Sequence, residues 1–356
     1  MIVATSAGAK NNHRLSSLGL MLLKGRTFIA LAALLAYFSF YAPNFTQIPS
    51  LILMIKHAAI YGLLALGMTL VIITGGIDLS VGAVVGLSAM LAGGLVVEGL
   101  RIPFLNVTIF FNVPAILLII CVIAVFVGLC SGLIISKLKV PAFIATLGAM
   151  YVCRGFAMLR SGGATFPNLG SPPHGHEIVQ GYDFIGSANV PNTEIPYTIV
   201  VFLVMAIISL FIMKKTPLGN QIYAVGGNER AATLSGIQTK KVKLFVYMYS
   251  AFLAAVAGLI MSSQLRAAHP STGEAWEMNA IAAVVLGGTS MSGGMGTIGG
   301  TIIGVLVITV LNDGMIMMGV SSFWQMVIKG VVIVLAVVID MMQKDLQRKV
   351  ALLARD

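Results

Sequence analysis

The chain has 356 residues, of which 58% are hydrophobic and 10% are charged. Soluble domains contain roughly 45 to 50% apolar residues, so this composition excludes a soluble globular protein. The formal net charge of +10 does not indicate nucleic-acid binding, because the lysines and arginines stand between apolar segments and form no continuous basic stretch. We expect an integral membrane protein that contacts lipid and binds no nucleic acid.

Apolar segments predict about ten transmembrane helices, and the predicted fold class is therefore an all-α integral membrane protein. A spanning helix needs about 20 mostly apolar residues, since the hydrocarbon core is about 30 Å thick and a helix rises about 1.5 Å per residue. The eighth segment is too short alone, so we expect it to extend back to Glu277 or to continue through its glycines. The segments are 27–42, 51–74, 81–100, 113–136, 142–159, 197–213, 242–261, 280–288, 298–318 and 323–342.

The distribution of lysine and arginine predicts the topology, because short cytoplasmic loops carry an excess of both. Residues 1–26, 214–243 and 343–356 are basic, whereas 161–196 contain no lysine or arginine. With ten spans the three basic segments fall on one side. We therefore expect cytoplasmic N-terminal and C-terminal tails, a cytoplasmic loop at 214–243, a periplasmic loop at 161–196 and a transmembrane domain over 27–342. No small-residue cleavage site follows the first apolar run, so its helix is expected to stay uncleaved.

Two glycine-rich stretches share the pattern G-G-x-x-x-S-x-G, at residues 75–82 and 287–294. Transporters often contain internal repeats whose helices break near the substrate path. The two stretches could thus be paired helix breaks. A chance match between glycine-rich turns is an equal alternative in a chain with 39 glycines.

The basic connection 214–243 carries the signals of a short helix. Asn228 is a favourable N-cap, Glu229 suits the first turn, and Gly236 can follow the last turn. We predict a two-turn helix in the cytoplasm with nothing in its own chain to bury it. Its apolar residues could enter a groove of a partner or lie on lipid headgroups. They are Ala231, Ala232, Leu234 and Ile237.

Five stretches, in order, resemble the ribose, galactose and arabinose type of sugar ABC permease. The Glu-x-Ala-Ala-x-x-x-Gly pattern at 229–236 resembles the coupling segment of ABC importer permeases, although Arg230 is inserted before the alanines. A further departure is Asn279, where this family commonly has an acid. The stretches are T-G-G-I-D-L-S-V-G, V-P-A-F-I-A-T-L-G, G-G-N-E-R-A-A-T-L-S-G-I, N-A-I-A-A-V-V-L-G-G-T-S-M-S-G-G and I-K-G-V-V-I-V-L-A-V-V-I-D.

The resemblance implies the permease subunit of an ATP-driven importer in the bacterial inner membrane, for a small sugar that is a pentose or hexose, with the ribose type favoured. Implied partners are a second permease chain, a cytoplasmic ABC ATPase subunit and a periplasmic sugar-binding protein. The sequence has no G-x-x-x-x-G-K-[ST] phosphate loop, so ATP and Mg are expected on the ATPase and no cofactor on this chain. The ATPase-docking residues that the resemblance implies are Gly227, Asn228, Glu229, Arg230, Ala231, Ala232, Leu234 and Gly236.

Polar residues within the spans are candidates for the translocation path, because a charge at the bilayer centre costs about 2.5 to 3.5 kcal/mol on insertion scales. Asp78 can instead cap a helix start after 75–76, and Asp313 can instead form a structural pair between helices. If both carboxylates couple ion movement, the chain is an ion-coupled secondary transporter, which needs no docking helix. The path candidates are Asp78, Ser80, Phe143, Asn279, Asn312 and Asp313.

Metal and catalytic sites are not expected. His174 and His176 alternate in the loop 161–196, but two histidines without a nearby cysteine pair make a weak metal site. No Ser-His-Asp, paired-carboxylate or Cys-His arrangement stands in a context that indicates catalysis. An intramembrane enzyme is therefore the least favoured class.

Overall fold

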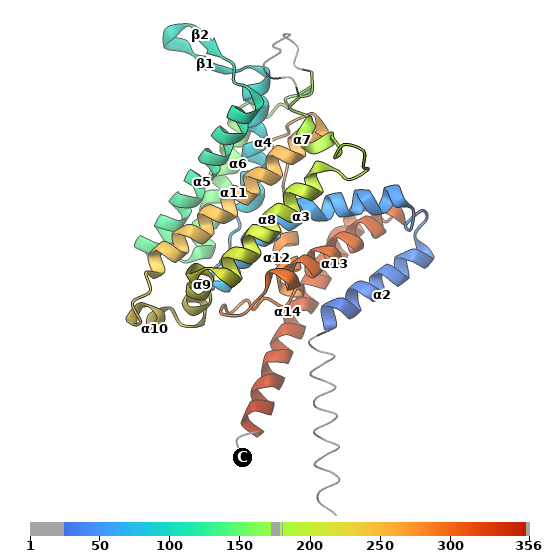
Figure 1. The fold of residues 1–356 in the computed structure, drawn as a ribbon, viewed down its shortest axis with the longest axis vertical. Coiled ribbons are helices and arrows are strands. Elements are labelled where there is room, and N and C mark those ends of the chain that lie inside the picture. The colour runs from blue at the N-terminus through green and yellow to red at the C-terminus, as the bar shows by residue number, and fades with distance from the viewer. Residues whose placement is uncertain (1–24, 172–178, 180, 354–356) are drawn as a thin grey trace, which may run out of the picture.

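The computed structural model describes residues 25–171, 179 and 181–353, which form a bundle of helices with one small hairpin (Figure 1). Most of the predicted N-terminal tail and the histidines at 174 and 176 lie outside the described residues. The helices are α2 (Arg26–Tyr41), α3 (Ile48–Ile73), α4 (Val81–Val97), α5 (Val113–Lys137), α6 (Ala142–Leu159), α7 (Phe184–Ser187), α8 (Tyr197–Lys215), α9 (Pro217–Gly227), α10 (Glu229–Leu234), α11 (Thr239–Leu265), α12 (Trp276–Leu286), α13 (Ile298–Met317) and α14 (Ser322–Leu353).

Each of the ten predicted apolar segments coincides with a helix. Within the described residues, α3, α5, α6, α8, α11 and α13 are the 6 helices long and apolar enough to cross a membrane. The apolar parts of α2, α4, α12 and α14 are shorter. The short eighth segment extends back through Glu277 to Trp276, as predicted, and α12 ends at Leu286 before the glycines.

Two boundaries differ from the prediction. The third segment was expected to run to Leu100, but α4 ends at Val97, and Leu100 starts strand β1 (Leu100–Ile102). This strand pairs antiparallel with β2 (Val107–Ile109) through the 3-10 helix η1 (Pro103–Leu105). The hairpin qualifies the all-α expectation. At the other end of the chain, α14 continues past 342 to Leu353.

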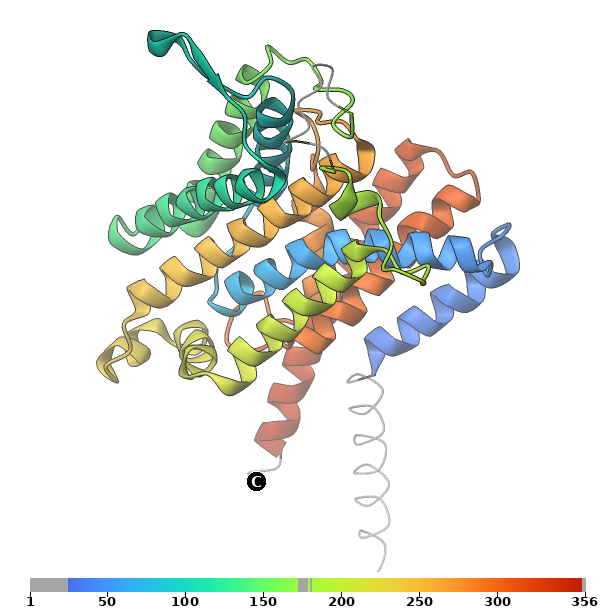
Figure 2. The ribbon, with the colours of Figure 1, turned by 45° about the horizontal axis from the view of Figure 1, so that its top comes forward.

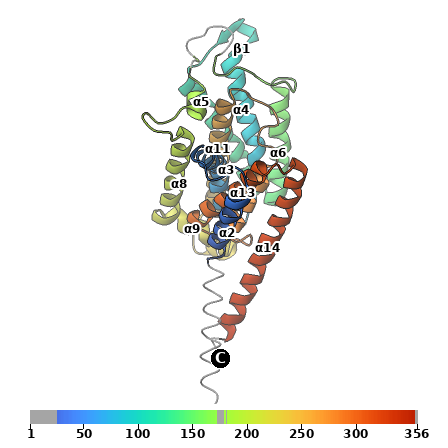
Figure 3. The same ribbon diagram turned by 90° about the vertical axis from the view of Figure 1, so that its right-hand side faces the viewer.

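Helix α11 lies in the middle of the bundle and packs against α5, α3 and α4. In lipid, van der Waals contact between small residues replaces the hydrophobic effect in bringing helices together. At the α5–α11 crossing, a Cβ on Gly128 would lie 2.5 Å from the backbone oxygen of Tyr247. Figures 2 and 3 show that α3 and α11 occupy the centre of the bundle. Helices α5 and α8 lie on one face of the bundle, and α6 and α14 lie on the other.

The bundle has two chemically different ends (Figure 1). We call the end that carries α9, α10, the start of α2 and the end of α14 the basic end. The opposite end, which carries the β1–β2 hairpin and α7, is the hairpin end. The described parts of the three basic segments thus share one end, as the lysine and arginine distribution predicts.

The described parts of the loop 161–196 are held at the hairpin end of α11 by backbone hydrogen bonds, such as Leu169 N–H to Arg266 O at 2.9 Å, and by side chains. The Tyr182 and Ser262 hydroxyls are hydrogen-bonded at 2.7 Å, and Gly186 N–H donates to Ser263 Oγ at 2.8 Å. Arg266 pairs with Asp183 at 2.8 Å. Burial raises the pKa of Tyr182, which keeps its phenol protonated. The loop therefore covers the end of α11.

Candidate functional site

The basic end carries two consecutive short helices, α9 and α10, that form one element. Pro217 opens α9, where its missing N–H costs nothing. Asn228 follows α9 and caps α10, since its Oδ1 accepts from Ala231 N at 3.0 Å. Gly236, with φ of 86°, follows α10 in the left-handed conformation that ends many helices. The predicted short helix with its two ends is confirmed, whereas α9 was not predicted.

Most of the α10 surface is available to a partner, but one predicted docking residue is not. Ala232 is only 5% exposed and belongs to the core of its own chain, so the expectation that nothing buries this helix is wrong at that position. Glu229 pairs with Lys243 of α11 at 2.7 Å and remains about half exposed. Leu234 is 83% exposed. The other predicted docking residues, Gly227, Asn228, Arg230, Ala231 and Gly236, are exposed.

The two G-G-x-x-x-S-x-G stretches lie side by side and touch α9. The first separates α3 from α4, and the second separates α12 from α13. Gly294 N–H donates to the backbone oxygen of Ile73 at 2.8 Å. Gly226 of α9 packs so closely on that same oxygen that a Cβ there would collide with it. Tyr223 Oη donates to Gly296 O at 2.8 Å, so α9 contacts the ends of both helix breaks.

Below α10, a cavity of about 590 Å³ joins this element to the first helix break. Its wall includes Glu229, Lys240 and Lys243 on one side and the turn 74–76 on the other. Ser136 also lines it, and its buried Oγ has no hydrogen-bond partner among the described residues. The cavity thus connects α10 and the start of α11 with the first helix break.

Asp78 is buried at the start of α4, in a closed set of hydrogen bonds. Its Oδ1 accepts from Ser80 N at 3.0 Å and Ser80 Oγ at 2.6 Å, and its Oδ2 accepts from Ser250 Oγ at 2.9 Å. Ser80, only 3% exposed, is itself the N-cap residue, so Asp78 forms the turn before the cap and is not the cap. Ser250, on α11, was not singled out from the sequence, because one serine in an apolar helix carries no signal.

Asp313 pairs with a histidine from a distant part of the chain. His57 Nδ1 of α3 lies 3.0 and 3.1 Å from its two carboxylate oxygens. The alternative of a structural pair between helices therefore describes the observed geometry. From His57 to the end of α3 at Ile73 the axis runs about 24 Å. Asp313 and Asp78 thus lie at different levels along α3 and form no common carboxylate site.

The remaining path candidates occupy different surroundings. Asn279 on α12 is 8% exposed, and Asn312 on α13 is 6% exposed. The Oδ1 atom of Asn312 has no hydrogen-bond partner among the described residues. Phe143, in the first turn of α6, is 53% exposed. None of the six candidates is among the residues that line the cavity next to α10.

Among the residues that the structure describes, no group of at least 3 histidine, cysteine, aspartate or glutamate side chains lies together.

An apolar helical bundle with buried polar pairs and a short exposed helix at its basic end is the architecture of a membrane-embedded permease. Residues 50–337 match the family described as "Branched-chain amino acid transport system / permease component", and the chain belongs to this family.

Curated relatives cover almost the whole chain. The ribose import permease protein of Bacillus subtilis (strain 168) is 42% identical over 88% of this chain and 91% of the relative. The ribose import permease protein of Haemophilus influenzae is 39% identical over 93% of this chain and 97% of the relative. The xylose transport system permease protein of the same organism is 33% identical over 89% and 95%. No solved structure matches the chain.

Proposed function

We propose that this chain is the membrane-spanning permease subunit of an ATP-driven ABC importer for a small sugar, a pentose of the ribose type. The family and the relatives named for ribose and xylose import support this assignment. The chain is a transport subunit and not an enzyme. ATP and Mg belong to a cytoplasmic ABC ATPase, a periplasmic sugar-binding protein delivers the substrate, and a second copy of the permease completes the path.

The proposed topology has ten spans in the bacterial inner membrane. The six long helices cross it, and the shorter apolar parts of α2, α4, α12 and α14 complete the count. The basic end faces the cytoplasm, with the loop 214–243 and both terminal segments, 1–26 and 343–356. The hairpin end faces the periplasm. The positive-inside rule supports this orientation, because the loop 161–196 contains no lysine or arginine.

The structural observation that best supports the proposal is the contact of α9 with both helix breaks. In the proposed mechanism α10 is the coupling helix, which the ATPase holds through Leu234 and the neighbouring exposed residues. When ATP binding moves α10, α9 moves with it. Gly226 then transmits the displacement to Ile73 and Gly294, because backbone packed on backbone has no side chain that can rotate away. The two helix breaks therefore shift together.

The second candidate function is an ion-coupled secondary transporter, with Asp78 and Asp313 as coupling carboxylates. Their geometry favours a structural role for both. Asp78 makes its hydrogen bonds to Ser80 and Ser250, and Asp313 faces His57. Side-chain contacts of this kind connect α4 to α11 and α3 to α13, which is the role of structural contacts between helices.

Reconstitution in liposomes separates the two functions. With the ATPase, the binding protein and ATP, we expect accumulation of ribose that persists when a protonophore collapses the proton gradient. Leucine serves as the comparison substrate, because the family description names branched-chain amino acids. Gradient-driven uptake by the isolated chain, abolished by Asp78→Asn or Asp313→Asn, would establish the secondary transporter instead.

Cysteine labelling tests the orientation. In a variant without Cys121, Cys130 and Cys153, a cysteine is placed at the exposed Ser187 or at the exposed Ser235. A membrane-impermeant thiol reagent should label position 187 in intact cells and position 235 only after the membrane is opened. The reverse pattern would place the basic end outside.

A further inference from the structure

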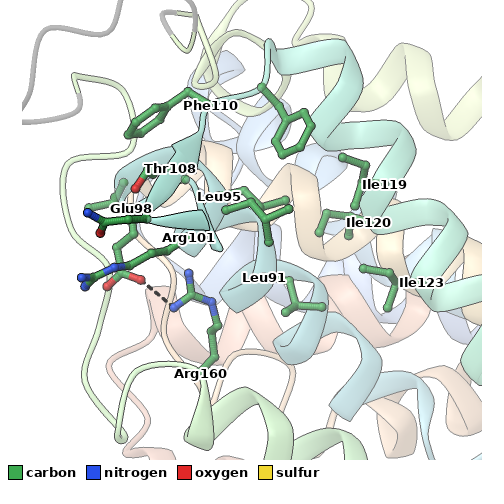
Figure 4. Close-up of a pocket in the computed structure, with 15 residues that line it drawn as sticks. Leu91, Leu95, Glu98, Arg101, Thr108, Phe110, Ile119, Ile120, Ile123 and Arg160 are labelled. Carbon is green, nitrogen blue, oxygen red and sulfur yellow. Dashed lines mark hydrogen bonds and ion pairs between the residues drawn. The ribbon is translucent and has the colours of Figure 1, made fainter. Parts of the chain in front are cut away.

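A second cavity, of about 940 Å³, lies at the hairpin end (Figure 4). The β1–β2 hairpin, the C-terminal part of α4, the N-terminal part of α5 and Arg160 after α6 enclose it. Small-molecule sites in proteins have volumes of about 300 to 1,000 Å³. The cavity is therefore large enough for an organic ligand and not only for ordered water.

The lining of this cavity is divided into an apolar and a charged part. Leu91 and Leu95 of α4 and Ile119 and Ile123 of α5 form the apolar part. Glu98, Arg101 and Arg160 form the charged part. Figure 4 shows the charged side chains on one side of the cavity and the isoleucines of α5 on the other. A ligand that satisfies both parts must be amphipathic.

The position of the apolar part matches the depth of one lipid leaflet. Ile123 lies ten residues into α5, which corresponds to about 15 Å along the helix, or half of the roughly 30 Å hydrocarbon core. Ile119 and Ile123 are half-buried. Their neighbours Leu118 and Val122 are 66% and 59% exposed on the outer surface of α5. The apolar part thus borders the surface of the bundle that contacts acyl chains.

The charged part has an excess of positive charge. Arg160 pairs with Glu98 at 2.6 Å, and its guanidinium also lies 5.2 Å from the ring centre of Phe166. Arg101 is exposed, and no carboxylate among the described residues is in ion-pair contact with it. One carboxylate therefore faces two guanidinium groups, and Arg101 is available to an anion.

We propose that this cavity binds an anionic glycerophospholipid, with its phosphate at Arg101 and an acyl chain along Leu91, Leu95, Ile119 and Ile123. The lipid would belong to the outer leaflet, because the proposed orientation places the hairpin end in the periplasm. This assignment to a leaflet rests on the proposed function. Bound lipid would fill the groove between α4 and α5 and fix the β1–β2 hairpin at the membrane surface.

Photo-crosslinking in nanodiscs tests the proposal on the full chain. The probe is phosphatidylglycerol with a diazirine on one acyl chain, and cross-linked peptides are mapped by mass spectrometry. We expect cross-links in 91–97 and 119–123 that unlabelled phosphatidylglycerol removes by competition. Arg101→Gln should lower their yield about fivefold, the effect of one basic residue at an anionic lipid surface. Lys215→Gln, which removes an exposed charge at the basic end, should leave it unchanged.

Two results would overturn the proposal. Absence of cross-links in both segments would exclude a lipid site there. Equal cross-linking by a phosphatidylcholine probe, unaffected by Arg101→Gln, would exclude recognition of the anionic headgroup. Circular dichroism of the Arg101→Gln variant checks that the exposed hairpin change leaves the fold intact. Nanodiscs offer the probe to both leaflets without ATPase, so this outcome is independent of orientation and of ATP-driven transport.

Discussion

The basic end and the hairpin end differ in how much side chains add to the backbone contacts. At the basic end, Gly226 packs backbone to backbone on Ile73, and Gly294 hydrogen-bonds to the same carbonyl. At the hairpin end, backbone hydrogen bonds also connect the loop 161–196 to the end of α11, and side-chain pairs add to them, as in the pair of Asp183 with Arg266. A contact of glycine on backbone transmits small displacements, because no side chain lies between the two segments. A side-chain pair retains a loop and can absorb movement.

The largest effect is expected from adding one methyl group to that backbone contact. Gly226→Ala places a Cβ on the Ile73 carbonyl, whereas Gly299→Ala, in the first turn of α13, meets no atom within 4 Å. Overpacking of a close-packed site costs about 1 to 3 kcal/mol, and here the obstacle is backbone that cannot change rotamer. We expect Gly226→Ala to abolish ATP-driven uptake and lower the melting temperature, with Gly299→Ala close to wild type.

Equal activity of the two variants would contradict the transmission role of α9. Loss of melting temperature without loss of uptake in the Gly226→Ala protein would show that the contact is structural only. Both readouts use the same purified protein, so the comparison does not depend on expression level.

A second effect, on stability, is expected at Asp78. Ser250→Ala removes the donor to Asp78 Oδ2 and leaves a buried carboxyl oxygen without its partner. Leaving a buried acceptor without its donor costs about 1 to 3 kcal/mol. The matched control is Ser136→Ala, because Ser136 Oγ is buried without a partner among the described residues. Thermal unfolding should show a clear loss for Ser250→Ala and none for Ser136→Ala, and equal stability would mean that Asp78 is held by Ser80 alone.

Local features of the fold were predictable from the sequence, and pairings between distant residues were not. The cap at Asn228 and the glycine at 236 are local signals, so α10 was predicted with both ends. The free-energy cost of placing a charge in the membrane made Asp313 a candidate. Its partner His57 was not predicted, because it lies 256 residues away in the chain and no periodicity connects the two residues. The β1–β2 hairpin was missed because apolar residues such as Leu100 extend the hydropathy of α4 beyond its end.

The hairpin end should respond differently from the basic end. Tyr182→Phe removes the hydrogen bond to Ser262 and leaves the ring in place, at a cost of about 0.5 to 1.5 kcal/mol. We expect a lower melting temperature with the same ratio of sugar transported to ATP hydrolysed. The ratio is measured with the permease, the ATPase and the binding protein together, and it shows whether the loop 161–196 affects coupling. An altered ratio would mean that the loop 161–196 takes part in coupling and does not only cover α11.

The smallest change in stability is expected at the Glu229–Lys243 pair, where the charges lie partly in solvent. Such pairs contribute about 0.2 to 1 kcal/mol, so Glu229→Lys should hardly affect unfolding yet should weaken co-purification with the ATPase. In the double variant Glu229→Lys with Lys243→Glu, the pair is restored with reversed charges. If Glu229 contacts the ATPase, as proposed, the double variant regains the small loss of stability and still fails to co-purify. Lys241→Glu, at an exposed neighbouring position, controls for the negative charge that Lys243→Glu adds in the double variant. Normal co-purification of the double variant would show that Glu229 only positions α10 through Lys243, and Leu234 with the exposed backbone of α10 would then be the docking surface.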